Sequence, residues 1–140
     1  MKVLLAVDGS EHTKRMLSYL AAHDELLGAG HEFLLATVVM AISPHAARYL
    51  DRKTLDTYYE EEADAVLKPA LAFAQQQGWA VQGVRARGHA AVELTAIAER
   101  EKCGLIVMGT HGHSSLGNLV LGSVATGVLA RGGVPVMLVR

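Results

Sequence analysis

The amino-acid sequence predicts an α/β fold: a single doubly wound, five-stranded parallel sheet with helices on both faces. Short apolar runs alternate with amphipathic helical patterns from one end of the chain to the other. Most of these runs are apolar at every position, as in strands that are covered on both faces. The length of 140 residues suits one domain, so we expect a single domain over residues 1–140.

Charge and composition exclude several classes of function. The formal net charge is −1, so we expect neither nucleic acid nor a membrane as a partner. No apolar run approaches the roughly 18 residues of a membrane span, and the first run is too short for a signal peptide. The single cysteine, Cys103, forbids an intramolecular disulfide and fits a reducing compartment. We therefore expect a cytoplasmic protein.

The first part of the chain predicts a strand, a helix and a second strand. Residues 2–7 form a continuous apolar run, and Ser10 is a suitable N-cap for the helix that follows. Apolar residues recur at helical spacing as far as Leu27, where Gly28 should end the helix. The second buried strand covers residues 33–39.

The middle of the chain is less regular. Residues 40–53 lack a clear period, and a loop of this length is often functional or mobile. A helix should start near Thr54 and end at Gly78, with a kink or a break at Pro69. Residues 81–87 alternate apolar and polar side chains, which indicates a strand with one wet face near an edge of the sheet.

The last part predicts two more helix–strand units. A helical stripe spans residues 91–98, and a fourth strand covers residues 105–108. The last helix should begin near Val124, and residues 134–139 form the fifth strand. Pro135 cannot donate to a strand ladder, which places it at a sheet edge or at the start of the strand.

A glycine-rich stretch joins the fourth strand to the last helix. It contains Gly109, Gly112 and Gly122, and Ser123 follows the last of these. Glycine allows close approach of the backbone to a ligand, and a helix N-terminus attracts anions. The stretch has neither the Gly-Lys-Ser/Thr of a Walker A loop nor the Gly-x-Gly-x-x-Gly of a dinucleotide site. A phosphate cradle is one interpretation, and glycines that only permit turns are the other.

Three further loops should lie beside this stretch. They follow Asp8, Val38 and Arg87, each at the carboxyl end of a predicted strand. Ligands of doubly wound sheets bind at this edge, where the strand order reverses. Four converging loops therefore predict one site.

The spacing Gly109-x2-Gly112-x9-Gly122-Ser123 resembles the nucleotide-binding signature of the universal stress protein family, in its ATP-binding branch. The runs 3–10 and 134–140 and the turn at Gly88-His89 are similar to the family as well, so the resemblance covers the whole chain. It implies the strand order 3-2-1-4-5 and an adenine nucleotide alpha-hydrolase-like, Rossmann-like fold.

The resemblance also implies a ligand and a set of contacts. The ligand is ATP, with Mg²⁺ or Mn²⁺ bound through the phosphates rather than by a protein cage. Adenine would lie between the first two loops, ribose beside the end of the fourth strand, and the phosphates along the glycine stretch. The implied nucleotide-binding residues are Ala6, Val7, Asp8, Val38, Met108, Gly109, Gly112, His113, Ser114, Gly122, Ser123 and Val124.

Two residues depart from the family pattern. His89 follows Gly88 where an acidic or small polar residue is common, and Met40 stands where many members carry an aspartate. Either change would alter the ribose contacts or the affinity. Neither removes a phosphate contact.

The resemblance implies a nucleotide-dependent regulatory module in stress response that acts on an unidentified protein partner. No catalytic constellation is evident. A slow ATPase or phosphotransferase that uses Asp8 or His113 is the first alternative, and a nucleotide-free interaction module is the second. The resemblance implies a homodimer through residues 134–139, and a long apolar edge strand agrees because it needs a partner.

Several polar residues have simpler interpretations. His12 is expected on the surface, and His111 as a solvated loop residue. Cys103 has no neighbouring base in the sequence and is expected to be structural. Arg85 and Arg87 either keep a sheet edge soluble or bind an acidic partner.

Overall fold

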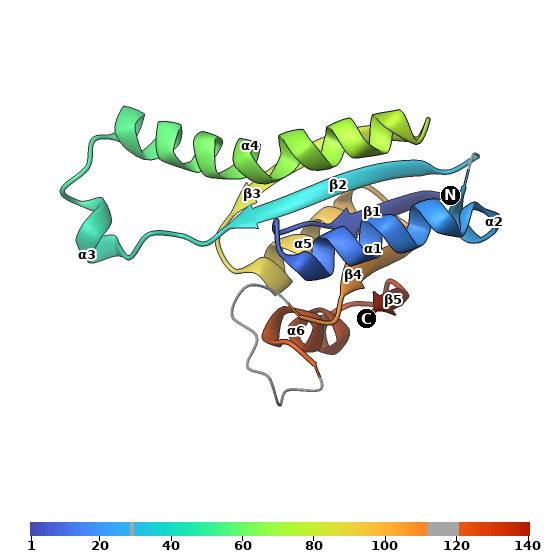
Figure 1. Cartoon of the computed structure of the whole chain (residues 1–140). Helices are drawn as coiled ribbons and strands as arrows, with labels where there is room; N and C mark the ends of the chain where they lie inside the picture. Colours follow the sequence, from blue (N-terminus) through green and yellow to red (C-terminus); the bar gives the residue numbers. More distant parts are fainter. Residues whose placement is uncertain (29, 112–120) are drawn as a thin grey trace.

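The computed structural model describes residues 1–28, 30–111 and 121–140. All strands of these residues lie in one parallel sheet with the order β3-β2-β1-β4-β5, which confirms the predicted order (Figure 1). The strands are β1 (Lys2–Ala6), β2 (Glu32–Val39), β3 (Ala80–Arg87), β4 (Leu105–Gly109) and β5 (Val136–Val139).

The burial of each strand follows its place in the sheet. The interior of β1 and β4 is fully buried, and β2 is buried from Phe33 to Thr37, as the unbroken apolar runs predict. At one edge, β3 alternates between exposed and partly buried residues, which confirms the predicted wet face. At the other edge, β5 begins directly after Pro135, where a missing backbone donor costs no ladder bond.

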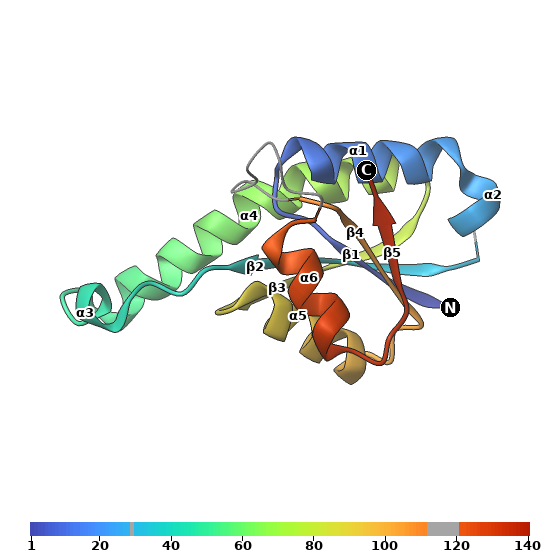
Figure 2. The same ribbon diagram turned by 90° about the horizontal axis from the view of Figure 1, so that it is seen from below.

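Helices cover both faces of the sheet (Figures 1 and 2). On one face, α1 (Glu11–Ala22) and α4 (Arg52–Gln76) bury a core that includes Phe33, Leu35 and Trp79. On the other, α5 (Ala90–Arg100) and α6 (Ser123–Arg131) bury a second core around Leu4, Leu34 and Ile106. Alternate residues of the central strands supply the two cores, as the two-residue period of a strand requires.

The first helix is shorter than predicted. Ser10 is its N-cap, as expected, and the Ser10 side chain accepts a hydrogen bond from the Thr13 N–H. The helix ends at Ala22, and Leu27 belongs to a separate short helix, α2 (Asp24–Leu27). His23 breaks the helix because its backbone leaves the helical region, although the apolar period continues across it. Gly28 does end α2. Only glycine fits at this position, because an added Cβ would lie 2.3 Å from the Asp24 carbonyl oxygen.

Of the kink or break expected at Pro69, the break is wrong, because α4 runs through Pro69 without interruption. Pro69 lies on the exposed face, so water can satisfy the Ala65 carbonyl that loses its helical donor. The opposite face packs on the sheet, and this packing outweighs the local cost. The helix begins at Arg52 rather than Thr54, because the Asp51 carboxylate caps the Thr54 N–H at 2.7 Å.

The irregular region before α4 contains one short helix, α3 (Pro44–Ala47), which Ser43 caps. This segment and the first part of α4 extend past the ends of the strands (Figures 1 and 2). Although α4 has 25 residues, neither it nor any other helix in the described ranges is apolar enough to cross a membrane.

Candidate functional site

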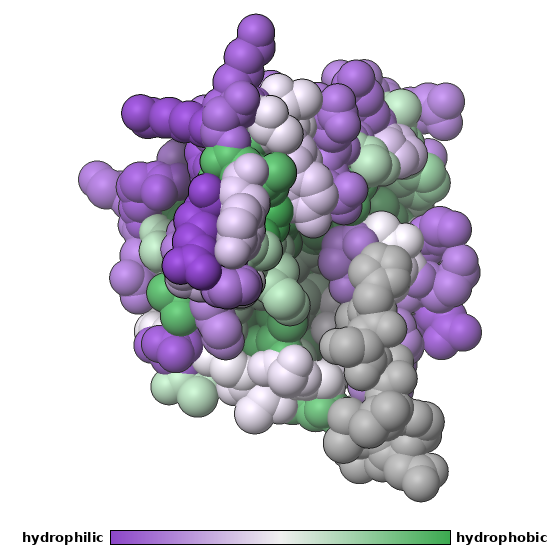
Figure 3. All heavy atoms as spheres, turned by 90° about the vertical axis from the view of Figure 1, so that its left-hand side faces the viewer, coloured by the Kyte–Doolittle hydropathy of each residue, from purple (hydrophilic) through white to green (hydrophobic). Residues whose placement is uncertain are grey.

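A cavity of about 420 Å³ opens at the carboxyl ends of β1, β2 and β4. Its volume lies within the range of roughly 300–1,000 Å³ that is typical of small-molecule sites. This end of the molecule is hollowed, with apolar side chains inside (Figure 3). The cavity lies where the chain leaves β1 toward one face of the sheet and β4 toward the other, which is the ligand position of doubly wound folds.

The unequal lengths of β1 and β2 expose polar backbone to the cavity. The last bond between them runs from the Val7 N–H to the Ala36 carbonyl at 2.9 Å, after which the chain turns away at Asp8. In a parallel strand, the backbone groups of alternate residues face the same neighbour. The N–H and C=O of Val38 therefore face the space beyond the end of β1, beside the cavity.

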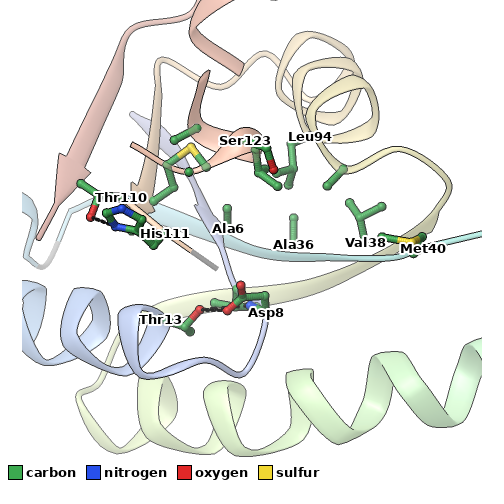
Figure 4. A pocket seen from close by; sticks show the side chains of 17 residues that line it. Ala6, Asp8, Thr13, Ala36, Val38, Met40, Leu94, Thr110, His111 and Ser123 are labelled. Carbon is green, nitrogen blue, oxygen red and sulfur yellow. Dashed lines mark hydrogen bonds between the residues drawn. The ribbon is translucent and has the colours of Figure 1, made fainter. Parts of the chain in front are cut away.

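The side of the cavity next to β2 is apolar (Figure 4). Ala6 and Ala36 form a floor of small side chains on neighbouring strands. Leu94 approaches from α5, and Val38 and Met40 line the end where β2 leaves the sheet. A shallow floor with aliphatic walls fits a flat, largely apolar ring.

Asp8 is held at the end of β1 by the first turn of α1. Its Oδ1 accepts hydrogen bonds from the Ser10 N–H at 2.9 Å and from the Thr13 hydroxyl at 2.7 Å. The Asp8 N–H donates to the same Thr13 hydroxyl at 3.0 Å. Gly9 makes this turn possible with a φ of 77°, in the left-handed region. The carboxylate is thus fixed at the cavity wall before any ligand arrives (Figure 4).

The opposite wall is the junction between β4 and α6. Gly109 ends β4 against α1, where an added Cβ would lie 2.9 Å from the Cβ of His12. Gly122 is the N-cap of α6, and its N–H donates to the Thr110 carbonyl at 2.6 Å. The first turn of α6, beginning at Ser123, lines the cavity and directs the positive end of the helix dipole toward it.

His12 and His111 differ from their expected surroundings. Their ring centroids lie 5.1 Å apart, and the His12 Nδ1 is buried without a hydrogen-bond partner among the described residues. His111 lines the cavity, and its Nδ1 lies 3.0 Å from the Thr110 hydroxyl oxygen. Both side chains are partly exposed, but they pack against each other instead of being fully solvated. The packing of α1 against Gly109 brings them together.

Every implied nucleotide-binding residue that the structure describes lines this one cavity. These residues are Ala6, Val7, Asp8, Val38, Met108, Gly109, Gly122, Ser123 and Val124. Gly112, His113 and Ser114 lie outside the described residues.

Sequence reasoning missed other residues that line the cavity. They are Thr13, Ala36, Ala90, Leu94, Thr110 and Ala125. One signal was available for Ala36, because it lies two residues before Val38 and must share its face of β2. The others are presented by helices or by a loop, and their places depend on tertiary packing.

Cys103 has the structural role that its sequence context predicts. It is buried in the core beneath α5, and burial raises the pKa of its thiol. A raised pKa disfavours the reactive thiolate. Within residues 1–28, 30–111 and 121–140, no group of three or more His, Cys, Asp or Glu residues is arranged to hold a metal ion.

Comparison with known proteins adds a family relationship. The family model described as "Universal stress protein family" matches residues 1–140. A universal stress protein of Thermus aquaticus is 35% identical over 99% of this chain and 97% of its own length. The universal stress protein YxiE of Bacillus subtilis is 30% identical over 99% of this chain and 98% of its own length.

Solved structures share the fold. Hypothetical protein MJ0577 of Methanocaldococcus jannaschii superposes with a TM-score of 0.80 at 26% identity, over 99% of this chain and 94% of that one. A universal stress protein family protein of Arabidopsis thaliana with AMP bound has a TM-score of 0.70 at 18% identity, over 99% and 90%. The universal stress protein of Archaeoglobus fulgidus in complex with dAMP has a TM-score of 0.69 at 19% identity, over 100% and 98%.

Proposed function

We propose that this chain, which belongs to the universal stress protein family, binds an adenine nucleotide in the cavity at the carboxyl ends of β1, β2 and β4. The observation that carries this proposal is the order of surfaces within one cavity. An apolar slot beside β2 is followed by the fixed carboxylate of Asp8 and then by the N-terminus of α6. The base, the sugar and the phosphate of a nucleotide follow one another in the same spatial order, and each suits the corresponding environment.

The apolar slot suits adenine. The Val38 N–H can donate to adenine N1, and the Val38 carbonyl can accept from the adenine N6 amino group. In the same orientation, guanine presents an acceptor at O6 and a donor at N1, which reverses the required order. Ala6 and Ala36 leave room for the ring, and Leu94 provides an aliphatic surface above it.

The carboxylate of Asp8 suits the sugar. Carboxylate oxygens accept hydrogen bonds from ribose hydroxyls, and the contacts with Ser10 and Thr13 hold this group at the cavity wall. Met108 and Gly109 at the end of β4 form the opposite side of the sugar position. The close contact of Gly109 with α1 leaves no space for a larger residue there.

The N-terminus of α6 suits the phosphates. Gly122, Ser123 and Val124 begin this helix at the cavity wall, where a positive dipole end favours anions. Gly112, His113 and Ser114 complete the proposed phosphate site on the basis of the family signature. With ATP as the ligand, Mg²⁺ or Mn²⁺ would bind mainly through the phosphate oxygens.

Two structural neighbours support the ligand class. The Arabidopsis thaliana protein holds AMP and the Archaeoglobus fulgidus protein holds dAMP, each in a fold that this chain shares. Both ligands contain an adenine base and a single phosphate. We therefore extend the proposal to adenine nucleotides as a class, with ATP as the expected ligand.

We propose a regulatory role for the bound nucleotide rather than catalysis. Asp8 Oδ1 already accepts two hydrogen bonds within the protein. This supports a role of Asp8 in positioning the ribose rather than a role as a general base. A homodimer through β5 would connect two cavities, because β5 follows the β4–α6 junction and lies at a sheet edge. Edge strands need a partner or protection, which supports such a dimer.

The experiment that tests this function is mass spectrometry of the small molecules that copurify with the protein. The proposal predicts an adenine nucleotide in the native eluate. Gel filtration in denaturant should release the same compound, in an amount proportional to the amount of protein. A purified protein that carries no such compound and shows no affinity for ATP at millimolar concentration would overturn the proposal.

A further inference from the structure

The segment that follows β2 forms the rim of the cavity at its apolar end. Met40 lines the cavity and is 82% exposed. Two residues later, the Ile42 N–H donates a hydrogen bond of 2.9 Å to the hydroxyl oxygen of Tyr59. Tyr59 belongs to α4, so this bond ties the rim to the helix that packs on the sheet.

Tyr59 is itself fixed on two sides. Its side chain is buried within the face of α4 that covers the sheet. The guanidinium carbon of Arg87 lies 4.7 Å from the centroid of the Tyr59 ring, a cation–π distance. Arg87 is held in turn by Asp56 of α4, with 3.1 Å between the guanidinium and the carboxylate. The Tyr59 hydroxyl oxygen is therefore held in a defined position, where it accepts the hydrogen bond from the Ile42 N–H.

The end of β3 also holds the backbone at the end of β2, beside the cavity. Arg87 is the last residue of β3 and pairs with Val39, the last residue of β2. The N–H of Gly88, one residue later, donates to the Val39 carbonyl at 2.9 Å. Val39 and Ile42 are thus anchored on either side of Met40, next to the polar backbone of Val38.

From these contacts we propose that Tyr59 is a positioning residue that sets base selectivity. By holding Ile42, it keeps the chain from Val38 to Met40 in one conformation, so that the Val38 N–H and C=O stay aligned for adenine. This inference rests on the proposed function and assigns a determinant of its specificity. Arg85 and Arg87 accordingly serve to attach α4, since Arg85 pairs with Asp64 and Arg87 with Asp56.

The test compares Tyr59→Phe with Tyr58→Phe. The first variant removes the hydroxyl that accepts from Ile42 and keeps the ring beneath Arg87. The second removes a hydroxyl from the neighbouring residue of the same helix, which is 39% exposed. Binding of ATP, adenosine and GTP is measured by calorimetry, and exchange of the Ile42 amide hydrogen is measured by NMR.

For Tyr59→Phe, we expect faster exchange at Ile42 and a loss of affinity of about 2- to 10-fold, the size of one hydrogen bond. The loss should be equal for ATP and adenosine, because it arises at the base, and the preference for ATP over GTP should shrink by a similar factor. Tyr58→Phe should match the wild type in every measurement. Thermal stability separates these effects from a general loss of structure, since Tyr59→Phe keeps the buried ring.

Three results would overturn the inference. If the wild type binds ATP and Tyr59→Phe binds it equally well with unchanged selectivity, the positioning role is wrong and the proposed function stands. If the wild type binds neither ATP nor adenosine, the proposed function itself fails, and the inference fails with it. A loss confined to ATP and absent for adenosine would also contradict it, because such a loss arises at the phosphates.

Discussion

The Thr13 hydroxyl donates a 2.7 Å hydrogen bond to Asp8 Oδ1 and accepts one of 3.0 Å from the Asp8 N–H. These two hydrogen bonds join the turn that follows β1 to the first turn of α1. The pair helps to fix the carboxylate that we assign to the ribose. Thr13 is therefore as much a part of the site as Asp8, although no motif marks it.

Thr13→Val tests this role with a side chain of almost the same shape. The variant removes a part-buried hydrogen bond to a carboxylate, so the free energy of unfolding should fall by about 1.5–3 kcal/mol. The affinity for ATP should fall several-fold, because Asp8 loses one of the groups that orient it. Urea unfolding measures the first effect and calorimetric titration measures the second.

Thr95→Val is the matched control. The Thr95 hydroxyl is also buried and donates to the Ala91 carbonyl at 2.6 Å, but Thr95 does not line the cavity. This variant should lose about 1 kcal/mol of stability and keep its affinity for ATP. Equal affinity in both variants would show that Thr13 has no role in the site.

Gly109→Ala should damage both the fold and the site. The added Cβ would lie 2.9 Å from the His12 Cβ and 3.3 Å from the His12 carbonyl oxygen, so backbone would have to move. Overpacking of this kind costs about 1–3 kcal/mol. We expect this loss in thermal or urea unfolding, together with weaker nucleotide binding.

Gly133→Ala provides the comparison for Gly109→Ala. An added Cβ at Gly133 meets no atom within 4 Å, so its stability should stay within about 0.5 kcal/mol of the wild type. The two variants make the same chemical change, one at the end of β4 and the other between α6 and β5. If both are equally stable, the close contact between Gly109 and α1 is not present in solution.

Cys103 predicts a dependence of stability on pH. Burial raises the pKa of its thiol in the folded protein above that in the unfolded chain. The stability that this difference provides is complete below the unfolded pKa and is lost as the pH rises through the folded pKa. The free energy of unfolding should therefore fall at alkaline pH in the wild type and fall less in Cys103→Ala.

Alkylation gives an independent measure of the same burial. Iodoacetamide should modify Cys103 only as fast as the protein unfolds, because a buried neutral thiol is unreactive. Modification at the rate of a free thiol, under conditions where the protein is folded, would contradict the buried position.

Val136→Pro tests the proposed homodimer through β5. The Pro135 and Val139 carbonyls accept from Ile106 and Thr110 of the β4 segment, so the backbone groups of Val136 face away from the sheet. Proline is tolerated at such an edge and removes only the outward donor. We expect a folded monomer in sedimentation velocity, with a circular dichroism spectrum like that of the wild type. A variant that remains dimeric would contradict assembly through this edge.

The order of elements and the position of the cavity could be predicted from sequence because both depend on local patterns. Unbroken apolar runs locate the buried strands, and the alternation before Arg87 places β3 at an edge. The glycine spacing and the ends of β1 and β2 locate the cavity wall.

What could not be predicted depends on packing between distant segments. The helical period continues across His23, so only the tertiary structure shows that α1 ends there. The local penalty at Pro69 is offset by the buried face of α4, which sequence reasoning cannot weigh. The contact of Tyr59 with Ile42 joins residues 17 positions apart across α3 and follows from no motif.

Titration of ATP into the uniformly labelled wild-type protein, followed by amide NMR, addresses nucleotide binding at this cavity most directly. Saturable shifts should appear at Val38, Asp8 and Ser123, which line the cavity from three different elements or their ends. GTP should produce weaker binding, with the largest difference at Val38. Absence of saturable shifts at millimolar ATP, or shifts confined to residues away from this cavity, would contradict the proposed site.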